Sequence, residues 1–245
     1  MRAGLLLALL AAGPALAQPA PAPLLPRATL PGIGSADPRR PVDSTALPWR
    51  GLGRVQLEIG GRCTGTLVGP RSVLTAAHCL VAARTGNLVQ PGTVHFLLGY
   101  RQGAYEAHAR VASFRIGPGY VPAAGGPVGA DWALLTLEAA LPADRALPLL
   151  RTAPPPRSPL MLGGYQQDRP EVLLADTGCR ALGLAQDAGL PLLVHDCAGT
   201  RGSSGAPLLA QAADGRWSVA GVASRVQRDI AMGQAVPAGS LPAMP

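Results

Sequence analysis

The stretch Leu74-Thr-Ala-Ala-His-Cys79 ends a short apolar segment with a histidine and a cysteine. The overlapping run Ser72–Thr75 and the earlier run Thr64–Val68 are rich in apolar and β-branched residues, which favour strands. Gly69-Pro70-Arg71 lies between the two runs and is a turn signal. The sequence therefore predicts a β-hairpin whose second strand ends just before His78.

Short strands separated by turn signals recur on both sides of this hairpin. Arg54–Ile59, which precedes it, alternates polar and apolar residues, as a half-buried strand does. The proline-rich stretch Thr152–Pro156 divides the strands into two groups. This spacing favours two antiparallel β-barrels or sandwiches, with helix limited to one turn after Ala76 and a short C-terminal piece. The later strands are expected at Thr93–Leu98, Arg110–Arg115, Trp132–Leu137, Pro159–Tyr165, Val172–Leu182, Leu192–His195, Pro207–Gln211 and Trp217–Ser224.

Composition excludes several classes of protein. The chain has 245 residues, of which 48% are hydrophobic and 14% are charged, too apolar a mixture for a disordered chain. Its 31 glycines and 26 prolines disfavour long helical bundles. The net charge is +7 and every basic residue is arginine, but the arginines form no basic block and are not interleaved with aromatic residues. We therefore expect a generally basic surface and no nucleic-acid partner.

The first residues have the pattern of a secretory signal peptide. Arg2 gives a positive start, Leu5–Ala12 an apolar core and Ala15-Leu16-Ala17 a small-x-small cleavage site. Beyond the first two dozen residues no apolar run reaches the roughly 18 residues that cross a membrane. We expect a secreted or periplasmic protein, with no stable membrane insertion once the signal, residues 1–17, has been removed.

The segment that follows the signal, residues 18–50, is rich in proline and alanine and shows no sustained periodicity. It is interpreted as a linker, a pro-segment or an N-terminal arm. Ordered structure is expected to begin near Gly53. The rest of the chain is divided into a first β-barrel over residues 51–150 and a second β-barrel with a C-terminal segment over residues 151–245.

The chain has four cysteines, all in the exported part. An even number of cysteines in an exported protein indicates disulfides. Three pairings are open, and proximity in the sequence favours Cys63–Cys79 and Cys179–Cys197. No C-x-x-C motif is present and no cluster has metal-ligand spacing, so neither a metal site nor a redox function is expected.

Three segments together contain the groups that serine chemistry needs. His78 ends a strand, Asp131 lies at the start of an otherwise apolar strand, and Gly202-Ser-Ser-Gly-Ala-Pro207 is a glycine-rich turn before another strand. Such chemistry needs a hydroxyl, a base that takes its proton and a carboxylate that orients the base. It also needs backbone N–H groups directed at the developing oxyanion, and glycines allow the backbone to turn in that way.

These segments resemble the motifs of the trypsin-like, chymotrypsin-fold serine peptidases. Thr75-Ala-Ala-His-Cys79 matches T-A-A-H-C at every position, and Asp131-Trp-Ala-Leu-Leu135 matches D-[IV]-A-L-L except at Trp132. Gly202-Ser-Ser-Gly-Ala-Pro207 resembles G-D-S-G-G-P, with Ser203 and Ala206 as departures. The resemblance implies an all-β fold of two antiparallel six-stranded β-barrels with the active site in the cleft between them.

Further segments are similar to the bacterial branch of that family, which includes the glutamyl endopeptidases. They are Asp37–Val42 followed by Pro48-Trp49, His195-Asp-Cys197, and Gly233–Pro237 near the end of the chain. The resemblance implies a serine endopeptidase that acts on extended polypeptides through an acyl-enzyme and that needs no cofactor. A monomer is expected.

The resemblance assigns a role to each residue of the motifs. His78 is the general base, Asp131 orients its imidazole and Ser204, not Ser203, is the nucleophile. The backbone N–H groups of Gly202 and Ser204 form the oxyanion hole. Ser224 closes the back of the triad and starts the strand that pairs with substrate, and the Cys63–Cys79 disulfide anchors the histidine loop.

Two positions distinguish this chain from trypsin. Ser203 stands where trypsin has the aspartate that pairs with a new N-terminal amine, so activation through such an ion pair is not expected. Ala198 stands at the floor of the specificity pocket and offers no anion, and Ala223 stands where the glutamyl endopeptidases have a histidine. These residues predict small or medium uncharged side chains at P1, the residue before the scissile bond, rather than Arg, Lys or Glu. The alternative hypothesis is a binding protein with a protease fold and no turnover.

Overall fold

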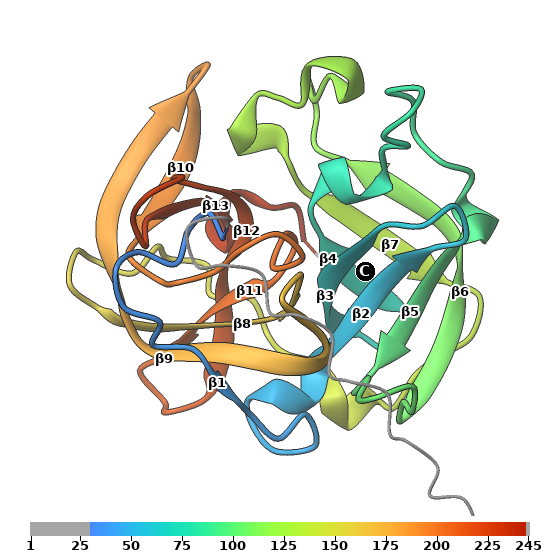
Figure 1. The fold of residues 1–245 in the computed structure, drawn as a ribbon, viewed down its shortest axis with the longest axis horizontal. Coiled ribbons are helices and arrows are strands. Elements are labelled where there is room, and N and C mark those ends of the chain that lie inside the picture. The colour runs from blue at the N-terminus through green and yellow to red at the C-terminus, as the bar shows by residue number, and fades with distance from the viewer. Residues whose placement is uncertain (1–29, 244–245) are drawn as a thin grey trace, which may run out of the picture.

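The structure, a computed structural model, describes residues 30–243. These residues form the strands β1 to β13, joined by loops and short 3-10 turns, and contain no α-helix. Two β-structures lie side by side, and the N-terminal segment runs across the second of them (Figure 1). The predicted signal, residues 1–17, and residues 18–29 of the predicted arm lie outside the described residues. Within residues 30–243, no helix is long and apolar enough to span a bilayer.

The first β-structure is a closed antiparallel barrel with the strand order β2-β3-β4-β7-β6-β5. In β5, Val94, Phe96 and Leu98 are buried and the residues between them are partly exposed, so every second side chain fills the barrel. The strands expected in this half are confirmed, with bounds that differ by a few residues. They are β2 (Leu52–Leu57), β3 (Arg62–Gly69), β4 (Ser72–Thr75), β5 (Val94–Leu98), β6 (Ala107–Ile116) and β7 (Ala133–Leu137).

The second β-structure is a 7-stranded antiparallel sheet with the order β1-β9-β10-β13-β12-β11-β8. A further pairing between β8 and β9 closes all of these strands except β1 into a second ring. The all-β fold with two antiparallel rings confirms the expected fold class. The strands are β1 (Arg40–Pro41), β8 (Pro159–Gln166), β9 (Arg169–Asp187), β10 (Leu190–His195), β11 (Pro207–Gln211), β12 (Trp217–Val226) and β13 (Gly233–Pro237).

Two features of the second half differ from the sequence-based expectation. Strand β13, which pairs with β10 and β12, was not predicted, because its few residues are too short a run to show a period. Ordered structure also begins well before Gly53. The Val42 N–H donates to the Leu173 carbonyl at 3.1 Å, and the Gly32 carbonyl accepts from the Gly199 N–H at 3.1 Å. The arm is thus ordered by backbone bonds to the second barrel and not by a periodicity of its own.

One apolar cluster joins the two barrels. It contains Leu74 and Trp132 from the first barrel and Tyr165 and Leu209 from the second, all of them buried. Trp49, in the turn η2 (Trp49–Gly51), also belongs to this cluster. Burial of apolar surface stabilises such contacts by about 25 cal/mol per Å². The cluster therefore fixes the two barrels against each other, which positions side chains from both of them at one site.

Both expected disulfides are present. Cys63–Cys79 joins β3 to the turn η3 (Ala77–Leu80), and Cys179–Cys197 joins β9 to the loop that follows β10. Both cross-links therefore lie next to segments that resemble the family motifs.

Candidate active site

His78 lies in the turn η3, directly after strand β4 ends at Thr75. Its backbone N–H donates to Asp131 Oδ1 at 2.9 Å, and its Nδ1 lies 2.7 Å from Asp131 Oδ2. A carboxylate only accepts hydrogen bonds, so this contact requires the proton on Nδ1 and leaves the lone pair of the neutral imidazole on Nε2. Within the described residues Nε2 has no hydrogen-bond partner, so it can accept a proton there.

Asp131 is buried at the end of the turn η6 (Val128–Ala130), just before β7. Its Oδ2 also accepts a hydrogen bond from Ser224 Oγ of β12, in the second barrel. Burial raises the pKa of Asp131, but the hydrogen bonds from His78 and Ser224 and the attraction of His78 outweigh it and leave the pKa below its ordinary value. Asp131 therefore stays ionised at neutral pH and connects the two barrels.

Ser204 lies in the loop between β10 and β11, and contacts to both barrels fix its backbone. Its carbonyl accepts from the Thr64 N–H of β3 at 2.9 Å, and the next N–H, that of Gly205, donates to the Ala223 carbonyl at 2.8 Å. Gly205 also lies against Thr75, close to His78. Among the described residues no hydrogen bond joins Ser204 Oγ to His78, a contact that often tightens only when substrate binds.

The two adjacent serines have different surroundings. Ser203 is buried and its hydroxyl donates to the Thr200 carbonyl at 2.6 Å. Ser204 is partly exposed, lines a cavity and has no side-chain hydrogen bond within residues 30–243. Of the two hydroxyls, only that of Ser204 is therefore available to react.

The loop around Ser204 leaves two backbone donors unused. Within the described part of the chain, neither the Gly202 N–H nor the Ser204 N–H donates to a protein acceptor. Gly202 has φ +95, and a Cβ atom there would lie less than 3.0 Å from the Tyr165 carbonyl oxygen, so only glycine fits. The Gly202 carbonyl accepts from Thr64 Oγ1 at 2.9 Å. Two free N–H groups beside a hydroxyl are the arrangement that stabilises an oxyanion.

A cavity of about 240 Å³ opens beside Ser204. Its described lining contains no acidic residue but includes two arginines and the N-terminal arm. Thr64, whose hydroxyl supports the Ser204 loop, and Pro31 are site residues that no sequence pattern indicated. The lining residues are Pro31, Leu162, His195, Thr200, Arg201, Ser203, Ser204, Ala223, Ser224, Arg225 and Val226.

Ala198, the expected pocket floor, is fully buried and is not part of the cavity lining. Its N–H donates to Asp176 Oδ2 at 2.9 Å, which holds the start of the Ser204 loop against β9. His195, at the end of β10, is part of the cavity lining. The path of the segment that leads to Ser204 decides that His195 lines the cavity and Ala198 does not. The spacing of the motifs in the sequence does not specify this path.

His195 is a neutral buried base. Its Nδ1 accepts from the Cys197 N–H at 3.2 Å, so Nδ1 carries no proton, and its Nε2 has no hydrogen-bond partner among the described residues. Burial lowers the pKa of His195 to about 4.

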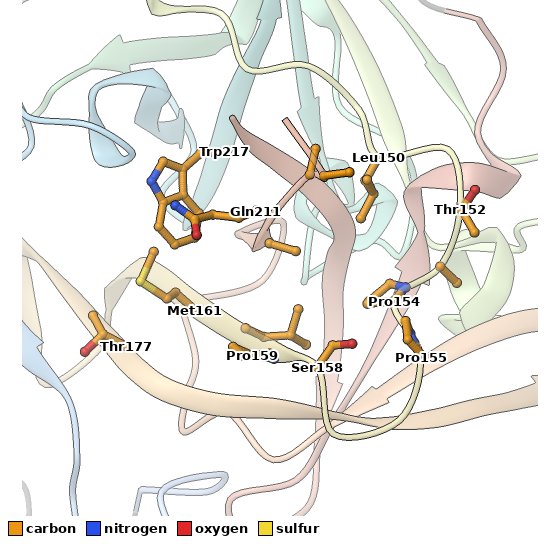
Figure 2. A pocket seen from close by; sticks show the side chains of 15 residues that line it. Leu150, Thr152, Pro154, Pro155, Ser158, Pro159, Met161, Thr177, Gln211 and Trp217 are labelled. Atoms are coloured by element: carbon orange, nitrogen blue, oxygen red, sulfur yellow. The ribbon is translucent and has the colours of Figure 1, made fainter. Parts of the chain in front are cut away.

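A larger cavity of about 470 Å³ lies elsewhere on the second barrel. Pro154, Pro155, Met161 and Trp217 surround it, and the segment that connects the barrels forms one side (Figure 2). The described residues that line it include no acid, no histidine and no cysteine. Ser204 and Ser224 line the first cavity, and Ser224 is hydrogen-bonded to Asp131, the partner of His78, so we assign the chemistry to that site.

Two groups of residues have metal-ligand geometry within residues 30–243. They are Cys63 with His78 and Cys79, and Cys179 with Asp196 and Cys197. Both pairs of cysteines form disulfides and therefore provide no thiolate ligands.

This chain is similar to known peptidases. Residues 63–222 match the family model described as "Trypsin-like peptidase domain". The chain is 39% identical over 62 residues to a glutamyl endopeptidase of Bacillus licheniformis, which covers 25% of this chain and 19% of that protein. It is 29% identical over 173 residues to serine protease 23 of Bos taurus, which covers 62% of this chain and 44% of that protein. The chain thus spans less than half the length of these relatives.

The fold is similar to that of a solved Glu endopeptidase in complex with MPD. The TM-score is 0.71 at 18% sequence identity, over 85% of this chain and 94% of that chain. At this identity the likeness concerns the fold alone. The family model, by contrast, matches more than half of the chain, and the matched residues include all three motif segments. The chain therefore belongs to the family of trypsin-like peptidase domains.

Proposed function

We propose that this chain is an exported serine endopeptidase that hydrolyses peptide bonds with Ser204, His78 and Asp131. The observation that carries the proposal is the position of Asp131, whose carboxylate accepts hydrogen bonds from His78 and from Ser224. Family membership supports peptidase activity. The predicted signal and the two disulfides support export.

In the proposed acylation step, His78 Nε2 takes the proton from Ser204 Oγ, which attacks the carbonyl carbon of the scissile bond. Asp131 keeps the proton of the neutral imidazole on Nδ1 and stabilises the imidazolium that forms. The free N–H groups of Gly202 and Ser204 stabilise the oxyanion. The imidazolium then gives its proton to the leaving amine, and the carbon–nitrogen bond breaks to give an ester on Ser204.

Deacylation repeats these steps with water as the nucleophile. His78 takes a proton from the water, the resulting hydroxide attacks the ester, and the oxyanion is stabilised by the same two N–H groups. Collapse of this intermediate breaks the bond to Ser204 Oγ, which recovers its proton from His78. The products are an amine and a carboxylic acid, and no redox partner is required.

Substrate binding is proposed along the end of β12. Strand β11 pairs with β12 only as far as Val222, so the following residues Ser224–Val226 have no β11 partner. An extended peptide can add to such an edge as a further strand. Its P1 side chain would then enter the cavity beside Ser204, whose described lining offers no anion to a cationic group.

A fluorophosphonate probe tests the proposal, because it labels only an activated serine. We expect the exported protein to be labelled, Ser203→Ala to retain labelling and Ser204→Ala to lose it. Hydrolysis of a peptide library should follow the same pattern. A folded wild-type protein that is not labelled and binds peptides without cleaving them would instead be the binding protein with a protease fold.

A further inference from the structure

Arg39, in the N-terminal arm, is a buried arginine with every side-chain donor in use. Its Nε donates to Asp37 Oδ1 at 2.9 Å, and its Nη2 donates to Asp37 Oδ2 and Asp168 Oδ2 at 2.9 Å each. Its Nη1 donates to Asp168 Oδ1 at 3.0 Å and to Gln166 Oε1 at 2.7 Å. Two carboxylates thus balance the buried guanidinium, and all five of its N–H groups are satisfied.

The bond to Gln166 connects Arg39 to the Ser204 loop. Gln166, at the end of β8, is fully buried, and its Oε1 accepts from the Thr200 N–H at 2.9 Å as well as from Arg39. One oxygen therefore fixes an arm residue and a loop residue at the same point. The neighbouring Gln167 makes two further hydrogen bonds to the same loop. Its N–H donates to the Arg201 carbonyl at 2.7 Å, and its Nε2 donates to Thr200 Oγ1 at 3.0 Å.

Thr200 in turn holds the residue before the nucleophile. Its carbonyl accepts from the Ser203 N–H at 3.0 Å and from Ser203 Oγ at 2.6 Å. On either side of Ser203 lie the free N–H groups of Gly202 and Ser204. Hydrogen bonds therefore connect Arg39 through Gln166 and Thr200 to Ser203, whose peptide bonds join it directly to the two oxyanion donors.

We propose that Arg39 is a positioning residue for the oxyanion hole. Through Arg39, the N-terminal arm keeps the Ser204 loop in its active geometry. The proposal rests on the serine peptidase function proposed above. Ser203 is uncharged and cannot form an ion pair that would anchor the loop. The charged side chain connected to the loop is that of Arg39, in the arm, and Gln166 makes the connection. Removal of one oxyanion donor costs an enzyme about 10²–10³-fold in kcat, which sets the scale of the effect.

The experiment compares Arg39→Met with Arg54→Met in the exported protein. Arg54 is a matched control, because it is also buried and paired with a carboxylate, that of Glu171, but has no bond to the Ser204 loop. The measurements are thermal stability, kcat, KM and the inhibition constant of a peptide aldehyde, whose hemiacetal oxyanion occupies the hole. Both variants should lower stability.

We expect Arg39→Met to lower kcat about 10²-fold and to weaken the binding of the peptide aldehyde by a similar factor, with KM within about 3-fold of wild type. Arg54→Met should change neither kcat nor aldehyde affinity. A folded Arg39→Met protein with wild-type kcat and aldehyde affinity would overturn the positioning role while leaving the peptidase function standing. A wild-type protein without Ser204-dependent hydrolysis would overturn both.

Variants of Gln166 decide the question if Arg39→Met does not fold. Gln166→Glu keeps an oxygen that accepts from Arg39 and from Thr200, whereas Gln166→Met removes it. We expect Gln166→Glu to retain most of the affinity for the peptide aldehyde and Gln166→Met to lose about 10²-fold, as Arg39→Met does. Equal aldehyde affinity in the two variants would overturn the proposal.

Discussion

Gly205, in the second barrel, lies so close to Thr75, in the first, that a Cβ atom built on it would be less than 3.0 Å from Thr75 Oγ1. The Thr64 carbonyl oxygen and the Ala76 nitrogen would also lie less than 3.0 Å from that atom. Thr75 is itself fixed, because its hydroxyl donates to the Thr64 carbonyl at 2.8 Å. Thr75 is three residues before His78 in the sequence. The close approach therefore places the residue after Ser204 next to the segment that carries His78.

Replacement of Gly205 by alanine should therefore separate Ser204 from His78. We expect Gly205→Ala to lower kcat/KM by on the order of 10²-fold or more, because a displacement of about 1 Å can have this effect. The matched control is Gly215→Ala, since Gly215 has a similar φ of +79 but nothing within 4 Å of its Cβ position. The control should lose about 1 kcal/mol of stability and no activity. Equal kinetics in the two variants would contradict the proposed contact.

The triad assignment predicts a specific pattern of kinetics. Ser204→Ala, His78→Ala and Asp131→Asn should each lower kcat/KM by about 10³-fold or more with the fold intact. The double variant of Ser204 and His78 should lose little more than either single variant, because the residues act as one unit. Steady-state hydrolysis of a chromogenic peptide measures these losses. A Ser203→Ala protein that is inactive beside an active Ser204→Ala protein would reverse the assignment.

The buried His195 predicts that stability falls in weak acid. Burial lowers its pKa from 6.5 to about 4 in the folded protein. Between these two values the unfolded chain binds a proton that the folded chain does not, so stability rises with pH in this window and is lost as pH falls from 6.5 to 4. The loss should be about 3 kcal/mol.

Urea denaturation of wild type and His195→Asn between pH 4 and pH 7 measures this effect. Asparagine keeps an acceptor for the Cys197 N–H but does not titrate, so the variant should show a smaller loss of stability across this range. Parallel curves for the two proteins would show that His195 is not the titrating group. Any loss that arises from Asp131 comes at lower pH, because its carboxylate is stabilising above its unfolded pKa and that contribution disappears only in stronger acid.

The lining of the cavity predicts discrimination against cationic P1 residues. Burial of an unpaired charge costs several kcal/mol, and no described acidic residue lines the cavity beside Ser204. Chromogenic peptides that differ only at P1 should therefore show kcat/KM values about 10²-fold lower for Arg and Lys than for medium-sized uncharged residues. Preferential cleavage after Arg would mean that P1 binds elsewhere, and the triad assignment would be unaffected.

Much of the fold and of the candidate site is predictable from local sequence. Alternation of polar and apolar residues in Arg54–Ile59 predicted the strand that the structure has as β2. Sequence proximity gave both disulfides, because cysteines close in the chain and joined by short loops meet readily. The three motif segments placed His78 and Asp131 in contact, as the structure has them. The strands and disulfides depend on residues close in the sequence, whereas the contact of His78 with Asp131 was expected from the family resemblance of their motifs.

Other features depend on loop paths and on contacts between distant segments. The packing of the Ser204 loop buries Ser203 and leaves Ser204 open to the cavity. The same path removes Ala198 from the cavity lining and adds His195 to it. The N-terminal arm has no periodicity, yet its Arg39 is buried against Asp168 and Gln166, more than a hundred residues away. The sequence by itself determined most of the strands and the two cross-links, because local patterns specify them, and the resemblance of its motifs indicated the candidate reactive groups. Only the tertiary structure decided which residues line the cavity and which hydrogen bonds hold the Ser204 loop. The reason is that these contacts join segments far apart in the chain, and no local sequence pattern predicts which distant segments meet.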